Sequence, residues 1–240
     1  MTIPGDPYDF PIEGSLVPEK TALMIIDMQR DFCDPSGYMH TRGGDVSLAR
    51  SIVPRISDVR DACWKAGIEV IYTREGHRAN LSDLPRPKRM KTALAGAEIG
   101  SQGPLGRLLI RGERGWDFID ELKPREAEIV IDKAGTGSFH GTDLHDILNN
   151  KKIENLIITG VTTAVCVNST VREAADRGYN VLVLEDCCAE PDPQTHAMAI
   201  QILKIEGGYL STISNSAQFL TAVPRFSGQI DRSNISEVRR

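Results

Sequence analysis

Six short apolar runs, separated by longer segments with a helical spacing of apolar residues, constrain the fold of this chain most strongly. The runs are TALMIID (21–27), IEVIYT (68–73), EIVID (128–132), NLIITGV (155–161), NVLVLED (180–186) and YLSTI (209–213). Such runs are typical of buried strands. Strands that alternate with helices through right-handed crossovers form a parallel sheet. We therefore predict an α/β fold with a doubly wound, mainly parallel six-stranded sheet in a Rossmann-like three-layer arrangement, with helices on both faces.

Apolar positions between the runs predict the helices. A helix over 48–63 is indicated by apolar residues on one face, with Pro54 in its first turn or at a kink and Gly67 at its end. Three further helices are predicted. The first follows a Thr142 cap and carries Leu144, Ile147 and Leu148; the second carries Val167, Val171 and Ala174 and stops at Gly178. The third carries Met198, Ile202 and Ile205 and closes at Gly207-Gly208.

The remaining segments divide the chain. Residues 1–20 carry four prolines and predict an extended N-terminal arm. A single domain is expected over 21–223, with a polar C-terminal tail over 224–240. The stretch from about 74 to 127 is too long for an ordinary connection, so we expect a loop insertion that covers an active site or a subunit contact.

Composition excludes several partners. The chain has 28 basic and 33 acidic side chains, a net charge of −5, and its basic residues are scattered. This distribution argues against nucleic acid and against a membrane surface. No run is long enough to span a membrane, and the N-terminus is neither basic nor hydrophobic, so we expect a cytoplasmic protein. The 5 cysteines have no metal-ligand spacing and are expected to be free thiols.

Three residues that could do chemistry lie at the carboxyl ends of predicted strands, where open α/β sheets bind their ligands. Asp27 ends the first run, Lys133 follows the third, and Cys166 begins the helix after the fourth. A cysteine near a helix N-terminus is favoured as thiolate, the form that attacks carbonyls. Taken singly, Cys166 could be core packing, Asp27 a cap and Lys133 a surface ammonium. Their shared position favours a base, a cation and a nucleophile.

These residues lie in segments that resemble a known family. IIDMQRDFC, DKAGTGSF and TGVTTAVCVNSTVREAADRGYNVLVLEDCC are similar to the three catalytic segments of the isochorismatase-like cysteine hydrolases. The resemblance covers about residues 18–222 and implies that Asp27, Lys133 and Cys166 form the catalytic triad. It also implies a cis peptide at Val161–Thr162 and an oxyanion hole formed by the backbone N–H groups of Thr162 and Cys166.

Within the family, IDMQxDFC, TREGHRxxLxDLP, RGExGWD and LEDCC look most like biuret hydrolases and related ureido-amide enzymes. The nicotinamidase metal site is not matched, since CDPSGYMHTRGGD offers only His40 without the usual spacing. We therefore expect no metal and no other cofactor. Phe32 is expected to wall the pocket, as the matching aromatic does in relatives.

Two further residues are candidates for substrate binding. Glu206 stands where the biuret-hydrolase pattern has Gln. It could be a solvated helix end. However, a carboxylate at a helix C-terminus is disfavoured by the helix dipole, and hydrogen bonds accepted from the substrate could offset that cost. His77 could bind substrate, although holding the long loop is the favoured interpretation.

The leading hypothesis is a cysteine-dependent amidohydrolase that cleaves a C–N bond of a small ureido or carbamoyl compound such as biuret through a covalent thioester-type intermediate, releasing ammonia. The alternative substrate is an anionic amide such as ureidoacrylate or an N-carbamoyl amino acid, which Glu206 in the pocket would disfavour. A non-catalytic binding member of the fold is the third possibility. The expected partners are a small-molecule amide and further copies of the chain in a dimer or tetramer.

Overall fold

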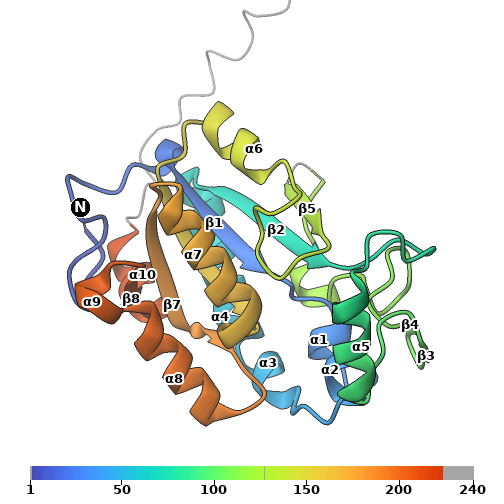
Figure 1. The fold of residues 1–240 in the computed structure, drawn as a ribbon. Helices are drawn as coiled ribbons and strands as arrows, with labels where there is room; N and C mark the ends of the chain where they lie inside the picture. The colour runs from blue at the N-terminus through green and yellow to red at the C-terminus, as the bar shows by residue number, and fades with distance from the viewer. Residues whose placement is uncertain (1, 127, 224–240) are drawn as a thin grey trace, which may run out of the picture.

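A six-stranded parallel sheet forms the centre of the molecule. The computed structural model describes residues 2–126 and 128–223, and the strand order is β5-β2-β1-β6-β7-β8 (Figure 1). Every neighbouring pair in this sheet is parallel. The strands are β1 (Thr21–Ile26), β2 (Glu69–Glu75), β5 (Ile129–Lys133), β6 (Asn155–Val161), β7 (Asn180–Ala189) and β8 (Thr212–Ser214). The predicted fold class is confirmed.

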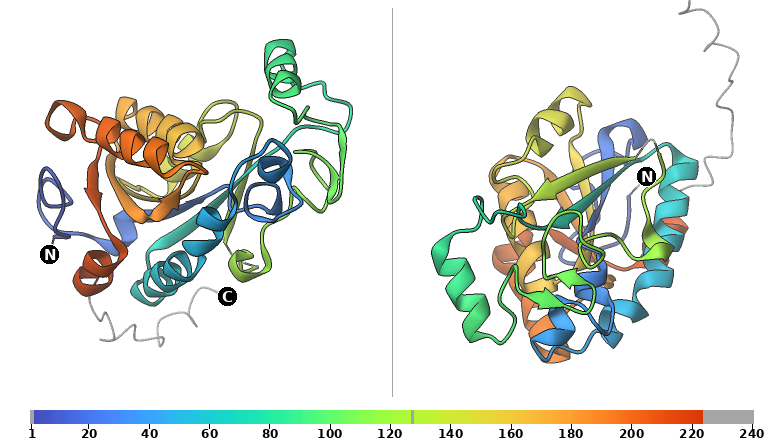
Figure 2. Two further views of the ribbon diagram at one scale, coloured as in Figure 1. Left: turned by 90° about the horizontal axis from the view of Figure 1, so that it is seen from below. Right: turned by 90° about the vertical axis from the view of Figure 1, so that its right-hand side faces the viewer.

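Helices cover both faces of the sheet. They are α1 (Arg30–Cys33), α2 (Tyr38–Thr41), α3 (Ser47–Ser51), α4 (Val53–Ala66), α5 (Arg86–Leu94), α6 (Leu144–Asn150), α7 (Asn168–Asp176), α8 (Pro193–Leu203), α9 (Ile205–Gly208) and α10 (Ser216–Ala222), with short turns η1 (Pro18–Lys20), η2 (Asp120–Leu122) and the π-helical η3 (Thr163–Val167). Figure 2 shows α6, α7 and α8 on one side of the sheet and α4 and α10 on the other.

Alternation along β1 connects the two layers of the core. Leu23 and Ile25 pack with the α4 side, whereas Met24 and Ile26 pack with the α7 side. Successive side chains of a strand point to opposite faces, so an uninterrupted apolar run is what a sheet covered on both sides requires.

Two predicted helices differ in detail. The helix expected over 48–63 is two helices, α3 and α4, because Pro54 lies in the first turn of α4 and has no N–H to continue the preceding helix. Gly67 ends α4 with φ of 75°, as predicted. On α8 the expected apolar face is wrong: Met198 and Ile202 are exposed. The buried face of α8 consists of Ala199, Ile200 and Leu203.

The segments outside the sheet have ordered contacts where they are described. In the N-terminal arm, Asp6 exchanges two backbone hydrogen bonds with Ile213 of β8, and Phe10 is buried. The predicted C-terminal tail, 224–240, lies outside the described residues. None of the described helices has the length and apolar character needed to cross a membrane.

The stretch expected to be a loop insertion contains its own elements. It carries α5, the hairpin of β3 (Gln102–Gly103) and β4 (Gly106–Arg107), and η2. Several of its apolar residues are buried, including Ile99, Leu108 and Phe118. Helix α5 differs, since it has no buried residue and stands away from the sheet (Figure 2).

Candidate active site

Four ionisable side chains meet at the carboxyl edge of the sheet, each supplied by a different strand end. Asp27 follows β1, Glu75 ends β2, Lys133 ends β5, and Cys166 lies in η3 directly after β6. These strands are neighbours in the sheet, so their ends converge. The structure therefore brings together the three predicted residues Asp27, Lys133 and Cys166, and adds Glu75.

Close approach of β6 to β1 brings the cysteine loop beside Asp27. At Gly160, φ is 112°, and a Cβ there would lie 2.1 Å from the carbonyl oxygen of Ile26. Only glycine fits this backbone contact. The next peptide, Val161–Thr162, is cis, as the family resemblance predicted. The chain then enters the π-helical turn that carries Cys166.

Asp27 and Lys133 form a fully buried ion pair. Lys133 Nζ lies 2.7 Å from Asp27 Oδ2, and both side chains are 0% exposed. The ammonium also donates to the carbonyl oxygens of Gly135 and Thr136, at 3.1 and 2.9 Å. Thr73 Oγ1 donates to Asp27 Oδ1 at 2.6 Å. Because a buried charge is costly unless it is paired, these contacts fix both groups in position.

Burial and neighbouring charges set the protonation of the site. Burial raises the pKa of Asp27 despite the opposing effect of Lys133, and Glu75 raises it further. Burial also raises the pKa of the Cys166 thiol well above its ordinary value, against the opposing effect of Lys133. Burial opposes the charged form of Lys133, but Asp27, Cys166 and Glu75 raise its pKa. Desolvation thus favours the thiol form of Cys166, in opposition to the effect expected from a helix N-terminus.

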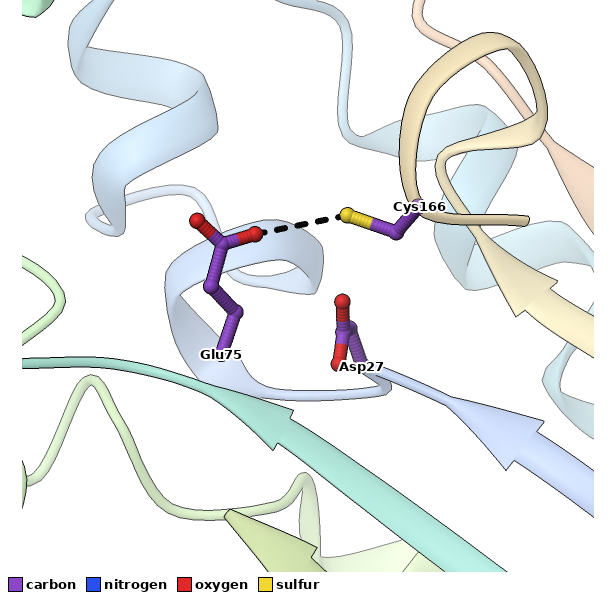
Figure 3. Close-up of side chains that lie close together, drawn as sticks. All are labelled: Asp27, Glu75 and Cys166. Atoms are coloured by element: carbon purple, nitrogen blue, oxygen red, sulfur yellow. Dashed lines mark hydrogen bonds between the residues drawn. The ribbon is translucent and has the colours of Figure 1, made fainter. Parts of the chain in front are cut away.

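Glu75 is the residue that the sequence analysis missed. Its Oε2 accepts a hydrogen bond from Cys166 Sγ at 3.3 Å, and its Oε1 lies 2.6 Å from Lys88 Nζ. Figure 3 shows the carboxylates of Asp27 and Glu75 and the sulfur of Cys166 pointing toward one another. Ligand atoms of these three residues lie within 4.8 Å of one another, a spacing at which they could hold a metal ion. The ammonium of Lys133 already supplies a positive charge beside Asp27.

A cavity of about 450 Å³ opens above this cluster. It is lined by Phe32, Tyr38, Met39, Arg42, Gly43, Gly44, Glu75, Lys88, Ile99, Leu109, Thr136, Thr162, Val165, Cys166, Glu190, Pro191 and Asp192. Phe32, Thr162 and Cys166 thus line the pocket, in agreement with their predicted positions. The cations Arg42 and Lys88 lie on its wall. Glu190 accepts a hydrogen bond from the backbone N–H of Ala164 at 2.9 Å, next to the cysteine turn.

The two other predicted substrate-binding residues do not line this cavity. His77 is completely buried. Its backbone N–H donates to the carbonyl oxygen of Leu109 at 2.8 Å, and its backbone carbonyl accepts from the backbone N–H of Arg111 at 2.9 Å. It therefore holds the long segment, which was the favoured interpretation. Glu206 is exposed in the short helix α9, with φ of 55°. Helix α8 ends at Leu203, and Glu206 belongs to the separate helix α9, which lies near the N-terminal arm (Figure 1). It is not among the residues that line the cavity.

The other four cysteines lie away from the cavity. Cys33, Cys63, Cys187 and Cys188 are free and buried, which confirms the prediction of free thiols. None of them lines the cavity that Cys166 reaches.

Comparison with known proteins identifies the family. The model of the isochorismatase domain matches residues 21–215. The ureidoacrylate amidohydrolase RutB of Acinetobacter baylyi is 34% identical over 207 residues, covering 82% of each chain. RutB of Caulobacter segnis is 30% identical over 227 residues, 91% of this chain and 90% of its own. A cysteine hydrolase of Pseudomonas syringae has the same fold, with a TM-score of 0.74, 24% identity, and coverage of 88% of this chain and 95% of its own. The chain therefore belongs to the isochorismatase family.

Proposed function

We propose that this isochorismatase-family amidohydrolase hydrolyses a small carbamoyl compound that carries a carboxylate, through a covalent intermediate on Cys166. The observation that supports this most directly is the Cys166 thiol, buried beside the Asp27–Lys133 ion pair at a cavity whose wall carries Arg42 and the Lys88–Glu75 ion pair. A nucleophile, a base with a raised pKa and a fixed cation are the groups that covalent amide hydrolysis needs.

In the first half-reaction Asp27 accepts the proton of Cys166, and Sγ attacks the carbonyl carbon of the substrate. The carbonyl oxygen becomes an oxyanion, which the N–H groups of Thr162 and Cys166 would stabilise. Asp27 then gives the proton to the leaving nitrogen, and the C–N bond breaks. Lys133 keeps Asp27 in place throughout.

In the second half-reaction Asp27 accepts a proton from water, and the resulting hydroxide oxygen attacks the thioester carbon. The C–S bond breaks, and the proton returns from Asp27 to sulfur. For a carbamoyl substrate the products are an amine and carbamate, and carbamate decomposes to ammonia and carbon dioxide.

The anionic substrate class, rather than biuret, is favoured by one guanidinium, Arg42, on a cavity wall that also carries the carboxylates of Glu75, Glu190 and Asp192. Lys88 is already paired with Glu75. Arg42 lies on the same wall and forms no ion pair with any carboxylate of residues 2–126 and 128–223, although its charge acts on Glu190. A guanidinium is suited to bind a carboxylate through paired hydrogen bonds. The objection based on Glu206 is removed, since this residue does not line the cavity. The relatives named ureidoacrylate amidohydrolase support the same choice.

An ammonia-release assay over a substrate panel tests this proposal. The panel contains ureidoacrylate, N-carbamoyl-β-alanine, N-carbamoylglycine, biuret, triuret and nicotinamide, with Cys166→Ser as the inactive control. We expect kcat/KM for the best carboxylate-bearing carbamoyl compound to exceed that for biuret by about tenfold or more, the effect of one charge-assisted contact. EDTA should not change the rates. Preference for biuret would reject the anionic class, and the absence of any carbamoyl turnover would reject the function.

A further inference from the structure

Two carboxylates approach the sulfur of Cys166, although the proposed chemistry uses only one. Asp27 is bound by Lys133 and by the hydroxyl of Thr73. Glu75 is bound on one oxygen by Lys88, and its other oxygen accepts the hydrogen bond of the thiol, with Lys133 Nζ 3.8 Å away. The side chain of Glu75 is only 6% exposed and lines the cavity. It therefore faces whatever binds next to the sulfur.

The two carboxylates have different chemical environments. Burial works to raise the pKa of Glu75, but the ammonium groups of Lys133 and Lys88 outweigh it and hold this pKa below its ordinary value. The pKa of Asp27 is raised. Asp27 is thus the better proton carrier, whereas Glu75 stays ionised and only accepts hydrogen bonds.

Formation of the intermediate changes what Glu75 contacts. Once sulfur is bonded to carbon, the S–H group is gone, and Glu75 Oε2 loses the donor that it has in the resting enzyme. Lys88 stays on Oε1, but a buried carboxylate oxygen without a donor is costly, so another donor is expected to take the place of the thiol at Oε2. The nearest candidate donors are the groups attached to the carbonyl carbon that is now bonded to sulfur.

A carbamoyl group supplies such a donor, and a simple carboxamide does not. The carbonyl carbon of a carbamoyl compound bears nitrogen on both sides: one nitrogen leaves and receives its proton from Asp27, while the other stays on the carbon with its N–H. In a carboxamide the atom that stays is a carbon. Sites built to accept a hydrogen bond reject analogues that lack it.

Building on the proposed function, we propose that Glu75 selects carbamoyl compounds over carboxamides by accepting a hydrogen bond from the nitrogen that stays on the carbonyl carbon. Lys88, which binds the other oxygen of Glu75 and the carbonyl oxygen of Ala134 at 2.7 Å, holds the carboxylate in the required orientation. Glu75 is in this assignment a substrate-binding residue and not a second base.

Glu75→Gln tests this assignment in the full-length enzyme. Lys88 donates to the side chain, so the amide oxygen of Gln would turn toward Lys88, and its NH₂ group would face the substrate N–H, donor against donor. The matched control is Glu154→Gln, which removes an exposed carboxylate paired with Lys20 at the opposite edge of the sheet. Glu75→Asp is the second variant, because it keeps the charge for Lys88 and Lys133 and only withdraws the carboxylate.

The substrates form a matched set around N-carbamoyl-β-alanine. N-acetyl-β-alanine has a methyl group in place of the terminal NH₂, and glutaramate has a methylene in place of the internal NH, so the pair covers cleavage at either C–N bond. Inhibition constants of both analogues are measured in addition to their kcat/KM values. The carbamoyl compound can then be compared with the carboxamides even if the enzyme does not turn the carboxamides over.

We expect Glu75→Gln to lower kcat/KM for the carbamoyl compound about tenfold to hundredfold, while values for the matched carboxamide change less than about threefold. Glu75→Asp should act in the same direction, and Glu154→Gln should change neither. An equal fall for both substrates, or no fall, would overturn the assignment. The proposed function is judged from the wild type alone: turnover by the wild type with an unchanged ratio in the variants rejects only the role of Glu75.

Discussion

Two lysine–carboxylate pairs lie at opposite ends of strand β1, with the same contact distance and very different surroundings. Lys20 Nζ lies 2.7 Å from Glu154 before the strand begins, where the side chains are 46% and 60% exposed. Lys133 Nζ lies 2.7 Å from Asp27 after the strand ends, where both are 0% exposed. An exposed pair contributes about 0–1 kcal/mol, whereas removing one partner of a buried pair costs about 3–5 kcal/mol. Burial, and not distance, is what separates the two pairs.

The largest expected effect comes from neutralising the carboxylate of the buried pair. Asp27→Asn keeps the shape of the side chain but removes the proton acceptor, so kcat/KM should fall by about a thousandfold. Glu154→Gln, the same change in the exposed pair, should leave kcat/KM within twofold. Steady-state kinetics on the best substrate of the panel measures both. If the Asn variant kept more than a tenth of the wild-type rate, Asp27 could not be the base.

A smaller effect is expected on stability when the cations are removed. Lys133→Met leaves the buried Asp27 carboxylate without its partner, so the free energy of unfolding should fall by about 3–5 kcal/mol. Lys20→Met should lower it by no more than about 1 kcal/mol, and less in high salt. Urea unfolding followed by circular dichroism provides both values. Equal losses in the two variants would show that burial does not separate the pairs.

The smallest effect concerns the pH dependence of activity. Asp27 must be ionised to accept the thiol proton, so activity rises as pH rises through its pKa, which burial and then Glu75 hold above the ordinary value. Removing the charge of Glu75 lowers this pKa, so Glu75→Gln should move the acidic limb of kcat/KM to lower pH by about half a unit to one unit. Profiles of the residual activity, with Glu154→Gln as the control, measure the shift. A shift to higher pH contradicts the arrangement of charges described here.

The sequence predicted the residues that stand directly at strand ends. Asp27 and Lys133 each close an apolar run, and parallel strands place such ends together. Glu75 escaped this reasoning because the apolar run of its strand stops at Thr73. Strand β2 continues to Glu75, since Arg74 pairs with Asp132 of the next strand and stacks on Trp116, 3.7 Å from the ring centre. Contacts between residues so far apart in the sequence leave no recognisable pattern within a short segment of it.

The misplacement of Glu206 has a related cause. Apolar residues up to Ile205 predicted one helix that closes at Gly207-Gly208, but α8 ends at Leu203. Glu206 and Gly207 have positive φ and form a separate turn. Apolar spacing predicts that a helix exists more reliably than it predicts where the helix ends or which face is buried.

The segment between β2 and β5 supplies part of the cavity wall and can be exchanged separately from the strand ends of the sheet. The groups proposed to react come from strand ends of the sheet, whereas Lys88, Ile99 and Leu109 bring part of the cavity wall from this one stretch of chain. The residues proposed to cleave the bond and one part of the cavity wall are thus encoded in separate stretches of sequence. Exchanging residues 78–126 between family members is the direct route to changed selectivity with the cleavage machinery left intact.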